Sequence, residues 1–211
     1  VRHAEPMRRA LAVGVTAASL AVPASAANVD QQVVLRPSDV TVGPATAALD
    51  PMDLVLHDVD VPRGFQLDQS NSVLLSNAFL AAHQPELRPL IARTGRVTGY
   101  FARYVNYAPP RWTYVHSSAT VFRRPEGAKM YLAWYIKEVR KEVSGRLELT
   151  AVDLGDKGWR YTTRSPETST TVAWVHGRVV ATAAARLVVQ HRKLAPAVAR
   201  IQQRRIVAAL R

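Results

Sequence analysis

The 211-residue sequence contains no cysteine. This absence excludes disulfides, thiol catalysis and cysteine metal sites. It also argues against a lipoprotein anchor, which needs a cysteine directly after the cleavage site. A chain of this length can bury a sizeable core, so it can fold by packing alone.

The sequence also lacks the common catalytic and cofactor motifs. It has no G-x-S-x-G, no H-E-x-x-H, no P-loop and no G-x-G-x-x-G. His57 and Asp58 are adjacent, but neighbours on a strand point to opposite faces and make a poor metal pair. We therefore expect no cofactor, no metal and no catalytic residue.

A single hydrophobic run occurs, at the start. Residues 7 to 27 read MRRALAVGVTAASLAVPASAA, with two arginines, an apolar stretch and an A-x-A site. That order predicts a secretory signal peptide cleaved near Ala26/Ala27. The run is shorter than the roughly 20 apolar residues that cross a bilayer. The alternative, a buried helix, fits poorly with Gly14, Thr16 and Pro23.

The sequence thus predicts a secreted or extracytoplasmic protein with no transmembrane segment. We divide it into the signal peptide (1–26), a proline-containing linker (27–52) and one domain (53–211). The linker carries Pro37, Pro44 and Pro51, and no aromatic residue lies between Asn28 and Gly64.

Acidic residues are scarce, and the formal net charge is +12. Residues 1 to 27 hold three arginines and one glutamate, which leaves +10 for the mature chain. Residues 28 to 70 have a balance of −5, and residues 71 to 211 have +15. A basic surface attracts anionic polymers, lipid headgroups or nucleic acid. The competing explanation is GC-rich coding, because arginine outnumbers lysine 23 to 5.

Hydrophobic periodicity predicts an α+β fold in one domain, an antiparallel sheet of about six to seven strands with helices packed on it. We expect a helical segment within 70–95, capped first by Ser70 or Asn71 and closed by Gly95. Pro85 and Pro89 impose either a kink or a division into two short helices. A short strand is expected within 53–65, before a turn at Pro62 and Gly64. The other expected strands cover 97–108, 111–124, 146–154, 158–164, 169–175 and 178–186.

Two further helices are expected. The helix at 125–143 has an apolar stripe of Ala128, Leu132, Tyr135, Ile136, Val139 and Val143, and the helix at 193–211 has an apolar face of Leu194, Ala197, Val198 and Ile201 that is not kept to its end. His176 and Gly177 are expected to form a hairpin turn between the last two strands.

Five ordered motifs resemble those of a group of secreted or lipid-anchored bacterial α/β domains: DVPRGF (60–65), GRVTGY (95–100), VFRRPEGA (121–128), LGD (154–156) and VAWVHGRVVA (172–181). The layout is similar, more loosely, to the extracytoplasmic domains of actinobacterial lipoproteins and sensor kinases, and to PsbP-like folds. The resemblance implies a fold and a compartment outside the cytoplasm. It implies no catalytic residues.

Polar residues on two expected strands form one candidate site. Arg160 and Arg164 lie on the opposite side of their strand from Trp159 and Tyr161. His116 and Ser118 lie on the opposite side of theirs from Val115, Ser117 and Ala119. If these polar faces coincide, the four side chains and Thr120 would line a site for a carboxylate or a phosphate. A serine-hydrolase role for His116 and Ser118 would need a hydrogen bond between them and a third group to orient the histidine.

Lys129, Lys137 and Lys141 lie on the basic side of the helix expected at 125–143. With Arg160, Arg164 and the C-terminal arginines they form a second candidate site, for anionic envelope polymers or an anionic membrane surface. Nucleic acid is the partner we least expect of an exported protein. We favour a non-enzymatic extracytoplasmic binding or interaction module, and the alternative is a small hydrolase that acts on the envelope.

Overall fold

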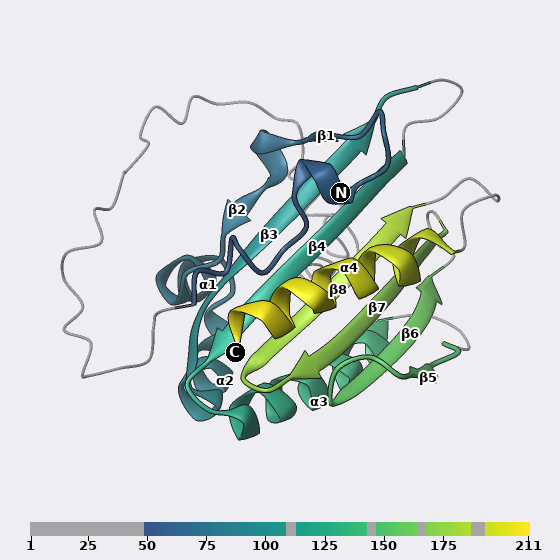
Figure 1. Ribbon diagram of the computed structural model, residues 1–211. Helices are drawn as coiled ribbons and strands as arrows, with labels where there is room; N and C mark the ends of the chain where they lie inside the picture. Colours follow the sequence, from purple (N-terminus) through teal and green to yellow (C-terminus); the bar gives the residue numbers. More distant parts are fainter. Residues whose placement is uncertain (1–48, 109–112, 143–146, 164–167, 187–192) are drawn as a thin grey trace, which may run out of the picture.

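The computed structural model describes residues 49–108, 113–142, 147–163, 168–186 and 193–211. Its centre is an antiparallel sheet in the order β1-β3-β4-β8-β7-β6-β5, with β2 also paired to β3 (Figure 1). This confirms the predicted α+β fold with one sheet. The strands are β1 (Gln66–Leu67), β2 (Val73–Leu74), β3 (Arg96–Asn106), β4 (Thr113–Phe122), β5 (Thr150–Val152), β6 (Lys157–Thr163), β7 (Ser169–His176) and β8 (Val179–Arg186).

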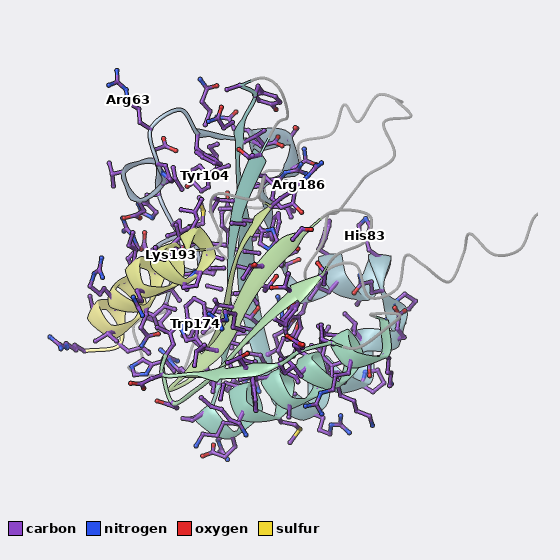
Figure 2. The ribbon with its side chains drawn as sticks, turned by 90° about the vertical axis from the view of Figure 1, so that its right-hand side faces the viewer. Arg63, His83, Tyr104, Trp174, Arg186 and Lys193 are labelled. Atoms are coloured by element: carbon purple, nitrogen blue, oxygen red, sulfur yellow. The ribbon has the colours of Figure 1, made fainter. Side chains whose placement is uncertain are left out.

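Helices cover both faces of the sheet. On one side lie α1 (Asn77–His83), α2 (Arg88–Thr94) and α3 (Pro125–Glu142), and on the other lies α4 (Leu194–Ala209) (Figure 2). We call these two sides the α3 face and the α4 face. No helix in the described part of the chain is long and apolar enough to cross a membrane.

The central strands are buried on both faces. Every residue from Ser169 to Val175 in β7 is buried, and so is every residue from Val179 to Ala185 in β8. Four alanines in β8 allow the helices to approach the sheet closely. Trp174 is fully buried on the α4 face, and its Nε1–H donates to Gln203 Oε1 of α4 over 2.6 Å.

The prediction of a short strand within 53–65 is wrong. This segment packs over the α4 face with Leu54, Val55 and Leu56 buried in succession, and a 3₁₀ turn follows at Asp58–Asp60. Side chains of the sheet satisfy its backbone in place of a neighbouring strand. The Leu56 amide donates to Ser117 Oγ over 2.9 Å, and Tyr104 Oη donates to the Leu56 carbonyl over 2.7 Å.

Pro85 divides the segment 70–95 into two short helices, one of the two predicted outcomes, whereas Pro89 lies in the first turn of α2. α1 ends at His83, a 3₁₀ turn covers Pro85–Leu87, and α2 ends at Gly95, whose positive φ of 63° closes the helix. The expected cap was wrong, because the first helix begins later. Ser76 caps α1 by accepting from the Phe79 amide, while Ser70 and Asn71 lie in an earlier 3₁₀ turn.

The two long helices match their predicted ranges. Ala128, Leu132, Tyr135, Ile136 and Val139 form the buried stripe of α3, as the spacing predicted. In α4 the predicted face was partly right, because Leu194, Val198 and Ile201 pack against the core, but Ala197 and the predicted end of the face were wrong. The buried positions are Ala195, Val198, Ala199, Gln202 and Ile206, so the face continues to Ile206, whereas Ala197 is exposed. Because the buried position 202 is a glutamine, a search for apolar residues alone does not detect that the face continues.

Candidate functional site

The register of the sheet places three cross-strand rows on the α3 face. They run from β6 to β3 and define which side chains lie beside one another. The first contains Trp159, Ala173, Thr182, Ser118 and Phe101; the second contains Tyr161, Thr171, Ala184, His116 and Arg103; the third contains Thr163, Ser169, Arg186, Tyr114 and Val105. No position in these rows is acidic.

The middle of these rows is polar and small. We call it the polar patch: His116, Ser118, Ser169, Thr171 and Thr182, around Ala184. Hydroxyl pairs connect it, because Ser118 Oγ lies 2.7 Å from Thr182 Oγ1 and Ser169 Oγ lies 2.8 Å from Thr163 Oγ1. Ser118 and Thr163 are partly exposed, so the patch reaches solvent at these positions.

One hydroxyl of the patch has no partner. Thr171 is fully buried, and its Oγ1 makes no hydrogen bond with any described residue. A buried polar group without a partner costs about 1–3 kcal/mol. Tyr161, its neighbour in the same row, has its hydroxyl engaged by Tyr135 of α3. Thr171 therefore offers a hydrogen-bonding group that no other described residue uses.

His116 is a neutral member of the patch. Only 3% of it is exposed, and its ring packs against the rings of Phe101 and Tyr114. Burial, with a smaller contribution from the Arg103 charge, lowers the pKa of His116 to about 4. At neutral pH the imidazole is therefore uncharged and can both donate and accept a hydrogen bond.

Two guanidinium groups border the patch beside Tyr114. Arg103 lies 5.0 Å and Arg186 lies 5.9 Å from the centre of the Tyr114 ring, within the range of cation–π attraction. Asp68 approaches Arg103 to 3.7 Å from outside the rows. In Figure 2, Arg186 points away from the sheet on the side opposite α4. Two guanidinium groups therefore lie at the border of the patch, and Asp68 offsets part of the Arg103 charge.

A further buried cation lies on the same face. Arg96 is 4% exposed, and its guanidinium donates to Asn77 Oδ1 and to the Leu75 carbonyl, each over 2.7 Å. Burial lowers its pKa, and it has no carboxylate partner among the described residues. Its contacts hold the start of α1 against β3, which is a structural role.

The structure does not bring the predicted arginines to this site. Arg160 pairs with Val172, which pairs with Ala183 and then Ser117, so Arg160 lies on the α4 side of the sheet. His116 and Ser118 lie on the other side, together with Thr120. The expected grouping with Arg160 was therefore wrong, and Arg164 lies outside the described residues.

The predicted lysines form a separate surface. Lys129, Lys137 and Lys141 are exposed on α3, and Lys141 Nζ lies 2.7 Å from Glu138 Oε1. They share the helix with Arg140 and face solvent away from the sheet. The combined surface expected from these lysines, Arg160 and the C-terminal arginines is thus divided between the two sides of the molecule.

Sequence reasoning missed Thr171, Arg103 and Arg186. The sequence does contain these polar residues, but they share a side of the sheet with His116 rather than with Arg160. Paired strands place Thr171 and His116 in one row. No group of three or more His, Asp or Glu side chains within the described ranges could hold a metal ion.

Comparison with known proteins adds one neighbour. No family model matches the chain, and no curated protein matches it. Among solved structures, the chain is similar to the extracellular domain of PknH from Mycobacterium tuberculosis, with 12% sequence identity and a TM-score of 0.46, over 72% of this chain and 94% of that one.

Proposed function

We propose that this chain is a non-enzymatic binding module that works outside the cytoplasm and holds the acidic group of a small ligand at the polar patch. The location rests on the signal-peptide pattern of residues 7 to 27. The binding activity rests on the composition of the patch and its border. Thr171 is the observation that carries the proposal, because its fully buried hydroxyl has no partner among the described residues and lies in rows that contain no carboxylate.

The chemistry of the patch fits a carboxylate or a phosphate. Thr171 Oγ1 can donate to an anionic oxygen, and guanidinium groups make strong, charge-assisted hydrogen bonds with such oxygens. Arg103 and Arg186 provide these groups at the border. The rows themselves contain no carboxylate, so the negative charge that competes for Arg103 is that of Asp68, outside the rows. Burial strengthens each electrostatic contact.

The environment of His116 does not favour the hydrolase alternative. A general base works best with a pKa near the operating pH, and a pKa of about 4 makes His116 a weak one at neutral pH. A nucleophile–base pair also needs a third group to orient the base. Among the described residues, His116 contacts the rings of Phe101 and Tyr114 and lies near the Arg103 charge. Ser118 forms its hydrogen bond with Thr182 and not with His116.

Inorganic phosphate and acetate, titrated separately into the full chain, test the proposal. Thr171→Val keeps the shape of the side chain and removes the hydroxyl. We expect it to leave thermal stability unchanged or raised, since it removes an unsatisfied group. Binding of the better probe should weaken by about 10- to 150-fold, since a charge-assisted bond is worth about 1.5–3 kcal/mol.

Two arginine variants locate the site. Arg186→Gln should weaken binding, while Arg160→Gln removes the same charge from the opposite side of the sheet and should not. Equal losses from both variants would show that net charge alone attracts the anion. Binding that Thr171→Val leaves intact would refute the role of the patch.

A further inference from the structure

Four cations form a straight row along the outer side of α4. Lys193, Arg200, Arg204 and Arg211 are all exposed, at intervals of seven, four and seven residues. At about 100° per residue, these positions project within about 40° of one another, and the row is about 27 Å long. Lys193 and Leu210, which flank the helix, keep right-handed helical dihedrals, so its ends do not turn the row aside.

The row carries one sign of charge. Residues 193 to 211 contain no acidic side chain, and the exposed positions beside the cations include Ala197 and Ala208. Arg205, on the flank of α4, pairs with Asp60 over 2.7 Å. No ion pair among the described residues involves the four cations of the row.

We propose that this row binds a linear polyanion, a polymer whose repeating units carry phosphate or carboxylate groups. A straight line of cations matches the successive charges of an extended polymer laid along the helix. A membrane surface fits less well, because helices that bind membranes insert large apolar side chains. The exposed large apolar side chains of the described residues all lie outside α4.

The lysines of α3 provide a matched comparison. Lys129, Lys137 and Lys141 spread over about 120° around their helix, so they do not form a line. Glu138 also pairs with Lys141. They lie on the opposite side of the sheet from α4. Replacing all three removes as many exposed cations as a triple variant of the row. The row also lies opposite the polar patch, so its test does not depend on the proposed small ligand.

The experiment measures binding of the full chain to long-chain inorganic polyphosphate and to poly-glutamate at several salt concentrations. Four contacts with a flexible polyanion predict a slope of log K against log salt of about −3, at about 0.7 per contact. The variant Arg200→Gln/Arg204→Gln/Arg211→Gln should reduce the slope to about −1 and weaken binding at low salt by about tenfold or more. Glutamine preserves the helix, because its propensity is close to that of arginine.

The variant Lys129→Gln/Lys137→Gln/Lys141→Gln removes the same charge and should keep most of the affinity and the slope. A preference for polyphosphate or for poly-glutamate identifies the acidic group of the polymer, and binding of either supports the row. Equal losses in the two triple variants would overturn the proposal in favour of net charge. Binding to phosphatidylglycerol vesicles but to neither polymer, or no binding at low salt, would also overturn it.

Discussion

Substitution of Gly127, in α3, tests how closely α3 approaches the end of α2. A Cβ atom added to Gly127 would lie 1.9 Å from the Thr94 carbonyl oxygen and 2.9 Å from its carbon. Real Cβ atoms essentially never come within 3.0 Å of another heavy atom. Gly127→Ala therefore requires the oxygen and the new methyl group to separate by at least 1.1 Å, the difference between 3.0 and 1.9 Å.

Two effects of this substitution oppose each other. Alanine in place of glycine within a helix gains up to about 1 kcal/mol from helix propensity. Overpacking costs about 1–3 kcal/mol, and here the obstacle is backbone, which cannot rotate out of the way. We expect the clash to dominate and the free energy of unfolding to fall by about 2 kcal/mol. For a domain of this size the melting temperature would fall by about 4–8 °C.

Calorimetry and denaturant unfolding followed by circular dichroism measure this change. Ala133→Gly is the control, because Ala133 is an exposed position of the same helix and reports propensity alone. That variant should lose up to about 1 kcal/mol. A Gly127→Ala protein more stable than the wild type would refute the close contact, because propensity would then be the only effect at work.

Three further substitutions address the sheet and its two faces. Ser117→Ala leaves the buried Leu56 amide without its acceptor, so we expect a loss of about 1–3 kcal/mol and faster hydrogen exchange at that amide; unchanged exchange would contradict the contact. Burial lowers the pKa of His116 to about 4, so the unfolded chain binds more protons between about pH 6.5 and 4, and stability falls by up to about 3 kcal/mol as pH decreases through that window. His116→Gln should remove this part of the pH dependence, and parallel profiles of the two proteins would count against it. Asp156→Ala removes the bond that the Gly177 amide donates in the β7–β8 turn, for an expected loss of about 1 kcal/mol by thermal unfolding, and an unchanged midpoint would show that the turn does not need it.

The parts of the fold predicted from sequence are those with strong local signals. The stripe of α3 runs from Ala128 to Val139, over about three turns. Gly177 marks the turn between β7 and β8, where its φ is 52°. The turn itself uses Gly177 and Arg178, one position later than expected, because His176 still pairs with Val179. Such elements depend on neighbouring residues, and tertiary contacts only shift their ends.

The segment 53–65 shows where local signals mislead. Its alternation of apolar and polar residues is typical of a strand. The Ser117 and Tyr104 side chains bind the backbone of Leu56 and so replace the neighbouring strand that alternation implies. No pattern within the segment reveals partners that lie 48 and 61 positions away.

The candidate site depended on information that a single strand does not contain. Alternation predicted correctly that His116 and Ser118 share one side of β4, and that Arg160 faces away from Tyr161 on β6. Which sides coincide depends on the register across β4, β8, β7 and β6, and a slip of one residue in any pair reverses the answer. The polar patch could therefore be assembled only from the pairing of all four strands.

The strand order also determines when the sheet can be completed. β4 is followed in the chain by α3 and three strands, yet its neighbour in the sheet is β8, so Val121 pairs with Val179 and Tyr114 with Arg186. Until the last strand is available, β4 and β7 each present an unpaired edge, and such edges are sites of aggregation. Contacts so distant in sequence also slow folding. During synthesis from the N-terminus, the strands β1 to β4 and the strands β5 to β7 therefore form two separate parts of the sheet until residues 179–186 join them. A truncation before β8 should yield an aggregating product rather than a smaller domain.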